Sequence, residues 1–104
     1  MAVSQVIRLQ AAPGRFGDVL ERGQKLRKIR ERLAPAAKTR QYVPASGSVA
    51  GVLIVVIEFA DMKQFGEYAD KLREDPEARA LLQSAYTDRD PLVLSQTIEL
   101  VREL

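Results

Sequence analysis

The sequence predicts an α+β domain in which the elements follow one another as strand, helix, strand, strand, helix, strand. Short segments rich in β-branched residues alternate with segments whose apolar residues recur every three or four positions. Pro and Gly residues separate these segments, as expected for turns. The chain has 104 residues, of which 46% are hydrophobic and 29% charged. We therefore expect residues 1–104 to form a single globular domain with a thin core.

The first half of the pattern begins with residues 3–10, whose partial alternation and β-branched content predict a half-buried strand. The run from Ala11 to Gly14 breaks the chain, and Pro35 ends the helix that follows over residues 15–33. Gly23 falls on the apolar face of this helix, where it would let another backbone approach closely. The apolar positions of that face are Phe16, Val19, Leu20, Leu26, Ile29 and Leu33.

The two middle strands differ in their expected burial. Residues 38–46 are predicted to form an edge strand, because Pro44 cannot donate a hydrogen bond to a neighbouring strand. A turn over residues 47–51 leads to residues 52–59, VLIVVIEF, which are apolar at both alternating sets of positions. This second strand is therefore expected at the centre of the sheet.

The second helical region carries its own start signals. Asp61 is a good N-cap residue, and Gln64 three positions later completes a capping-box pattern. Asp75 and Pro76 restart the helix, with Asp75 as a cap and Pro76 at the first helical position. Residues 92–101 are predicted to form the last strand, with a C-terminal helix as the alternative. The apolar positions of the second helical region are Phe65, Tyr68, Ala69, Leu72, Ala78, Leu81, Leu82 and Ala85.

Two right-handed split βαβ units produce the ferredoxin-like β-α-β-β-α-β arrangement, with an antiparallel sheet ordered 4-1-3-2 and both helical regions on one face. The opposite face would expose Val52, Ile54 and Val56 to water, so we expect a second copy of the chain to cover it. A five-residue turn would place Tyr42 opposite Val56. The same register would put Arg40 opposite Glu58, as an ion pair within this homodimer interface.

The first and last strands are neighbours in this arrangement. A register that pairs Val3 with Ile98 places Gln5 opposite Gln96 on the face directed at the helices. Buried amides need hydrogen-bond partners. The two amides therefore either satisfy each other or form a polar anchor in a pocket between sheet and helices.

Composition excludes several kinds of chemistry. The sequence contains no Cys, His, Trp or Asn. It therefore lacks the usual transition-metal and haem ligands and the commonest general base, and we expect neither a metal nor a cofactor. Asp88 and Asp90 in a short loop are expected to be solvated or to act as caps. The N-terminus shows no signal-peptide pattern and no apolar run is long enough to span a bilayer, so we expect a cytoplasmic protein without membrane contact.

The charge distribution is uneven although the net charge is only +2. Among the charged residues, those in segment 21–40 are mostly basic and those in segment 58–90 are mostly acidic. The basic side chains of the first helix spread around it instead of flanking an aromatic platform, and the third strand lacks the aromatic residues of RNA-binding sheets. We expect no nucleic-acid binding.

In the positions of its turns and helix breaks, the chain resembles the dimeric α+β barrel superfamily. This superfamily includes the antibiotic-biosynthesis-monooxygenase-like, NIPSNAP-like and EthD-like groups. The resembling segments are Ala12-Pro13-Gly14-Arg15-Phe16, the passage from Val56 to Asp61, and the helix break at Asp75-Pro76. The resemblance implies a homodimer whose two sheets meet face to face with the helices outside. It implies no reaction, because this fold carries many activities. Haem-degrading members use a His ligand, and the cofactor-free oxygenases of polyketide tailoring use Asn and Trp; all three types are missing here.

Three functions remain open, and the first is binding of a small apolar or amphipathic molecule between sheet and helices. The second is a cofactor-independent enzyme of the monooxygenase-like or a related kind, whose catalytic residues the sequence does not identify. Such an enzyme would use Tyr42, Tyr68 or Tyr86 as acid or hydrogen-bond donor. Arg8 or Arg40 would stabilise an anion, and Glu58 would serve as base. The third is a non-catalytic interaction module with an acidic partner. The candidate ligand-binding residues are Gln5, Gln96, Tyr68, Tyr86, Arg40 and Tyr42.

Overall fold

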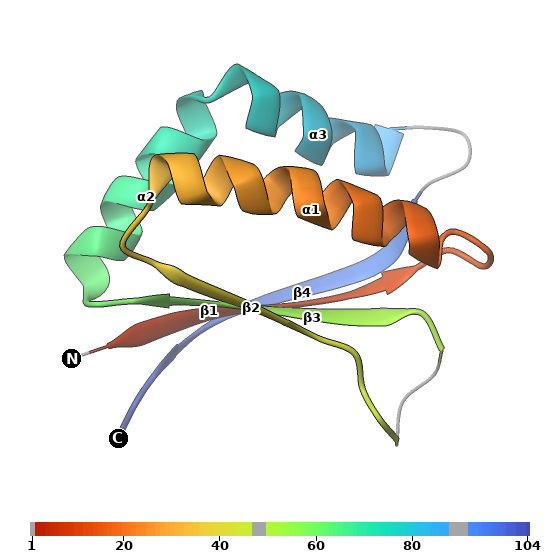
Figure 1. Cartoon of the computed structure of the whole chain (residues 1–104), viewed down its shortest axis with the longest axis horizontal. Coiled ribbons are helices and arrows are strands. Elements are labelled where there is room, and N and C mark those ends of the chain that lie inside the picture. The colour runs from red at the N-terminus through yellow and green to blue at the C-terminus, as the bar shows by residue number, and fades with distance from the viewer. Residues whose placement is uncertain (1, 47–49, 88–91) are drawn as a thin grey trace.

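A computed structural model of the chain describes residues 2–46, 50–87 and 92–104. It has two layers, a four-stranded antiparallel sheet and three helices that all lie on one face of it (Figure 1). Within these residues, the opposite face of the sheet carries no helix. The elements are β1 (Val3–Ala11), α1 (Phe16–Leu33), β2 (Lys38–Tyr42), β3 (Val52–Phe59), α2 (Met62–Glu74), α3 (Pro76–Thr87) and β4 (Val93–Arg102).

The sheet order is β2-β3-β1-β4, which confirms the predicted ferredoxin-like 4-1-3-2 arrangement. The final segment is a strand, so the helical alternative for the C-terminus is wrong. The second helical region is two helices, α2 and α3, divided at Asp75 as the sequence indicates.

The core lies between the sheet and the helices. Leu53, Val55, Ile57 and Phe59 of β3 point toward the helices and are at most 4% exposed. Phe59 lies at the centre of this core. Its ring lies 5.3 Å from that of Phe65 and 5.3 Å from that of Tyr68, centroid to centroid. Such aromatic pairs contribute beyond the area they bury, and they fix α2 against the sheet.

The predicted helix caps are present. The Asp61 carboxylate accepts a hydrogen bond from the Gln64 backbone N–H at 2.8 Å, while the Gln64 side-chain oxygen accepts one from the Ala60 N–H at 2.7 Å. At the second helix start, Asp75 accepts from the Ala78 N–H at 3.0 Å. These bonds satisfy backbone donors that the first helical turn leaves without partners.

The break after β1 is a turn stabilised by a hydrogen bond from the Arg15 N–H to the Ala12 carbonyl, 2.9 Å long. Pro13 and Gly14 occupy its central positions, and Gly14 has φ +76°. Pro followed by a residue of positive φ is the signature of a type II turn, which explains why this sequence ends the strand.

The predicted register between β2 and β3 is wrong by two residues. Lys38, not Arg40, lies opposite Glu58, while Arg40 lies opposite Val56 and Tyr42 opposite Ile54. The strand ends at Tyr42 instead of Ser46, and the connection to β3 is correspondingly longer than five residues. A two-residue shift preserves the face of each side chain, because side chains alternate with a period of two.

The predicted register between β1 and β4 is wrong by four residues. Val3 lies opposite Arg102, Gln5 opposite Leu100 and Leu9 opposite Gln96, so the two amides do not face each other. The strand runs further toward the C-terminus than expected, and the register shifts between Gln10 and Ala11. Alternation along a strand has a period of two, so it does not distinguish registers that differ by an even number of residues.

Two other observations refine the sequence analysis. Gly23 is buried, but the nearest atoms to a Cβ built there are side-chain atoms of Gln41 and Leu53 at 3.6 and 3.8 Å, not backbone. The expected close backbone approach is therefore absent at this position. No helix within the described residues is long and apolar enough to cross a membrane.

Candidate ligand groove

A groove of about 600 Å³ lies between β1 and the pair α2 and α3. It is broad and open to solvent on one side rather than enclosed. Its volume falls within the range of small-molecule sites, and its walls combine apolar surface with a few polar groups. The described lining residues are Gln5, Phe65, Tyr68, Ala69, Leu72, Arg73, Arg79, Leu82 and Gln83.

The neighbouring strand β4 extends the apolar surface beside the groove. Leu100 lies opposite Gln5, and Ile98 lies opposite Ile7, so both share the helix-facing side of the sheet. Ile98 is 55% exposed and Leu100 is 42% exposed. Side chains of this size are usually covered, so this edge of the sheet offers apolar area to a ligand or to another chain.

A second, much smaller cavity of about 40 Å³ lies deeper, between α1 and the sheet. Leu82 forms part of the wall of both spaces. The volume suits a water molecule or a small polar group but not a whole drug-sized ligand. The described lining residues are Ile7, Leu9, Val19, Arg22, Gly23, Leu26, Arg30, Leu53, Val55, Leu82 and Gln96.

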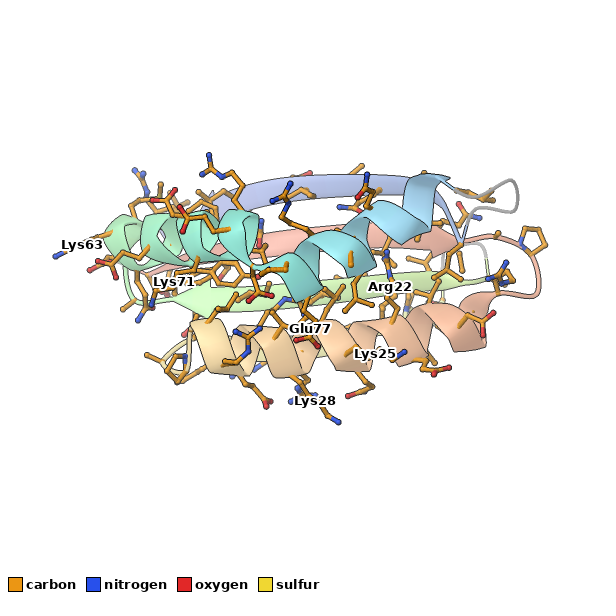
Figure 2. The ribbon with its side chains drawn as sticks, turned by 90° about the horizontal axis from the view of Figure 1, so that it is seen from above. Arg22, Lys25, Lys28, Lys63, Lys71 and Glu77 are labelled. Atoms are coloured by element: carbon orange, nitrogen blue, oxygen red, sulfur yellow. The ribbon has the colours of Figure 1, made fainter. Side chains whose placement is uncertain are left out.

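Arg22 and Arg30 bring positive charge into this interior. Each is only 8% exposed, although arginine is rarely buried. In Figure 2, Arg22 extends from α1 into the gap between α1 and α3, whereas Lys28 projects away from the body of the molecule. The Nη1 atom of Arg30 is buried and has no hydrogen-bond partner among the described residues.

Tyr68 connects the groove with the cavity, because it lines the groove and interacts with Arg30. Burial raises the pKa of the Tyr68 hydroxyl above 10.0, while the charge and a hydrogen bond of Arg30 act to lower it. The raised pKa keeps the hydroxyl protonated at neutral pH. Tyr68 can therefore donate a hydrogen bond to a ligand, but it cannot serve as a base there.

The structure separates the predicted ligand-binding residues. Gln5 and Tyr68 line the groove and Gln96 lines the small cavity. Arg40 and Tyr42 pair with Val56 and Ile54 on the opposite face of the sheet. The side chain of Tyr86 lies outside the described part of the chain.

The sequence analysis missed the arginines that surround these spaces. Arg22 lies three residues after Val19 and four before Leu26, and Arg30 lies four residues after Leu26. This spacing places both on the apolar face of α1. The spacing therefore indicates an inward position for both, whereas the sequence prediction considered the basic residues only as spread around the helix. Arg73 and Arg79 add two further cations beside the groove.

The described residues give no indication of a metal site. Within the described residues, no three Asp or Glu side chains gather in a way that could hold a metal ion.

The fold can be compared with known proteins. No protein-family model matches the chain. No curated protein matches it significantly either. Solved structures, in contrast, match over nearly its whole length. A NIPSNAP family protein from Agrobacterium tumefaciens is 14% identical, with a TM-score of 0.80, over 100% of this chain and 94% of the other.

The chain has a NIPSNAP-like fold. A second NIPSNAP family protein of Agrobacterium tumefaciens, described as having unknown function, is 13% identical over 96% of this chain and 86% of its own, with a TM-score of 0.74. A protein described as an antibiotic biosynthesis monooxygenase is 12% identical over 98% of both chains, with a TM-score of 0.71. The resemblance drawn from the sequence is thereby confirmed for the fold. At such identities the NIPSNAP-like fold says nothing about activity.

Proposed function

We propose that this protein binds a small apolar or amphipathic molecule in the groove between β1, α2 and α3. The observation that carries the proposal is the groove itself, with a volume of about 600 Å³. Phe65, Ala69 and Leu72 supply apolar contact area, while Gln5 and Tyr68 supply polar groups that can orient a ligand. This combination is typical of ligand sites, in which few polar groups decide orientation and apolar walls supply affinity.

The proposed ligand-binding unit is a homodimer whose subunits meet through the open faces of their sheets. On this face the partly exposed Ile54 and Val56 of β3 lie beside Val6 of β1, which pairs with Val56. Val52, which was expected to be exposed here, is only 5% exposed in the single chain. Arg40 and Glu58 lie on the same face, at its margin toward β2. A two-fold axis would bury the same apolar patch on both subunits, and the helices would remain outside.

The enzyme alternative receives less support from the arrangement of the residues. Tyr68 lines the groove, but Arg8, Arg40, Tyr42 and Glu58 lie on the other face of the sheet. Tyr68 and Glu58 lie on opposite faces of one sheet and cannot act on one substrate atom. Tyr42 and Glu58 share the open face, but the proposed homodimer would bury that face. Binding without catalysis therefore agrees better with the geometry of the single chain.

The groove can be tested with the neutral fluorescent dye Nile red. We expect the dye to bind and gain fluorescence, and Ala69→Trp to abolish the gain by filling the groove with a large side chain. Ala80→Trp is the matched control, because Ala80 is exposed on α3 and does not line the groove. Equal dye binding by both variants and the unmodified protein would place the dye elsewhere and disprove the proposal. Circular dichroism confirms that each variant is folded.

A further inference from the structure

The charges around the two spaces are of one sign. Arg22 and Arg30 line the cavity, and Arg73 and Arg79 line the groove. None of the described lining residues is Asp or Glu. In the buried cavity this charge attracts anions and repels cations, because the field in a low-dielectric site is poorly screened. Arg73 and Arg79 lie at the open groove, where water screens their charge.

Asp70, Asp75 and Glu77 form ion pairs with arginines, and one of these arginines, Arg73, lines the groove, so Asp70 partly balances its charge. Asp75 and Glu77 both interact with Arg32, at 2.8 and 3.6 Å, and Asp70 interacts with Arg73 at 2.9 Å. Arg32 is half exposed and lies outside the linings of both spaces. No ion pair of Arg30 with an acidic side chain occurs in the described parts of the chain.

Arg30 is therefore the unusual residue. Burying a guanidinium costs free energy unless charged or hydrogen-bonding partners compensate it. Tyr68 offers Arg30 one neutral oxygen, and the Nη1 atom remains buried without a partner in the described structure. A ligand oxygen carrying negative charge would supply the missing acceptor.

The sizes of the two spaces indicate how such a ligand would be divided between them. The cavity beside Arg30, about 40 Å³, holds a group comparable to a water molecule or a carboxylate. The groove, about 600 Å³, holds a much larger body. Leu82 lies in the wall of both spaces, and Tyr68 of the groove contacts Arg30 of the cavity, so the two spaces are adjacent. We take one elongated molecule to extend from one space into the other.

We infer that the ligand is an amphipathic carboxylic acid, whose carboxylate binds Arg30 beneath α1 and whose apolar body lies in the groove. Arg22 adds positive charge to the same cavity, and the Tyr68 hydroxyl can donate a second hydrogen bond to the carboxylate. This inference rests on the proposed function, since it specifies the chemical class of molecule that the groove accepts.

Isothermal titration calorimetry with decanoate, decanol and decylamine tests the inference. A charge-assisted hydrogen bond to a buried arginine makes decanoate bind about ten- to a hundredfold more tightly than decanol. Decylamine, which the buried Arg22 and Arg30 repel, should bind more weakly than either. Equal affinity for decanoate and decanol would overturn the inference.

Substitutions assign the preference to Arg30. Arg30→Met should remove most of the preference for decanoate over decanol, and should lower the affinity for decanoate far more than that for decanol. Arg27→Met is the matched control, because Arg27 lies on the same helix, pairs with Glu31 at 3.6 Å and lines neither space. If Arg30→Met does not fold, Arg30→Lys provides the test. This variant keeps the positive charge but loses the planar guanidinium that can form two parallel hydrogen bonds, so it should retain only part of the preference for decanoate.

The outcomes separate the inference from the proposed function. If Ala69→Trp abolishes dye binding but decanoate and decanol bind equally well, the groove remains the proposed ligand site and the inference of a carboxylic acid ligand is rejected. Decanoate binding that depends on Arg30 but not on Ala69 would retain the anion site and reject the groove as the place of the apolar body. Decanoate binding that survives Arg30→Met would reject Arg30 as the anchor.

Discussion

The guanidinium of Arg32 in α1 lies 2.8 Å from the carboxylate of Asp75, which stands 43 residues later at the start of α3. Asp75 thus links two helices while it also caps the second of them. The Ala78 N–H and then Arg32 stabilise the ionised carboxylate and lower the pKa of Asp75 below its ordinary value of 3.8. Protonation of this one group should therefore weaken both the cap and the link.

The first prediction concerns stability in acid. Because the folded-state pKa of Asp75 is lowered, its contribution is complete above pH 3.8 and is lost as the pH falls through the folded value. We expect Asp75→Asn to lower the melting temperature near neutral pH. The difference from the unmodified protein should shrink as the pH falls below 3.8. Thermal melts between neutral pH and strong acid measure it, and a difference independent of pH would contradict the prediction.

The second prediction concerns the open face of the sheet. Sedimentation equilibrium at micromolar concentration should give about twice the chain mass of 11.6 kDa. Ile54→Asp should yield monomers or unfold, because two carboxylates would meet in a desolvated interface. Leu20→Asp, on the partly exposed surface of α1, should leave the dimer intact. A mass of 11.6 kDa for the unmodified protein would refute the homodimer.

The third prediction follows from the corrected register of β1 and β4. Gln5 and Gln96 are separated by about four residues along the sheet, roughly 13 Å at the usual rise per strand residue. The effects of Gln5→Leu and Gln96→Leu on the free energy of unfolding should therefore add within about 0.5 kcal/mol. Urea unfolding of both single variants and the double variant measures the coupling. Recovery in the double variant would show that the amides do contact each other.

The fourth prediction compares two glycines. Gly23 lies inside α1, and a Cβ there would make only ordinary contacts. Gly23→Ala should thus stabilise the protein by about 0.5–1 kcal/mol through helix propensity. Gly14→Ala should destabilise it by about 1 kcal/mol, because Gly14 has φ +76° although its surroundings are open. Unfolding in urea decides both signs, and loss of stability in Gly23→Ala would reveal crowding in the cavity wall.

The fifth prediction concerns Tyr68. Its raised pKa should appear as a tyrosinate absorbance that develops only above pH 10.0 and disappears in Tyr68→Phe. Because folding raises this pKa, the corresponding stability is present below pH 10.0 and declines as the pH rises through the folded value. Persistence of the late absorbance in Tyr68→Phe would assign it to another tyrosine.

The sequence by itself determined the order of elements, the helix caps at Asp61 and Asp75, and the face on which each strand residue lies. These properties are local: caps depend on residues a few positions apart, and alternation along a strand has a period of two. For the same reason both register errors, by two and by four residues, left the side chains of β2 and β4 on their predicted faces.

Only the tertiary structure decided which residues meet across the sheet and which charges enter the core. The bulge near Gln10 affects the pairing of β1 with β4, and the end of β2 affects its pairing with β3. Neither feature produces a local sequence pattern from which it can be predicted. The burial of Arg22 and Arg30 depends on where α3 crosses α1 and the sheet, since an arginine on an apolar face can also extend its charge into solvent. Their spacing put them on the inner face of α1, but packing against α3 keeps them there.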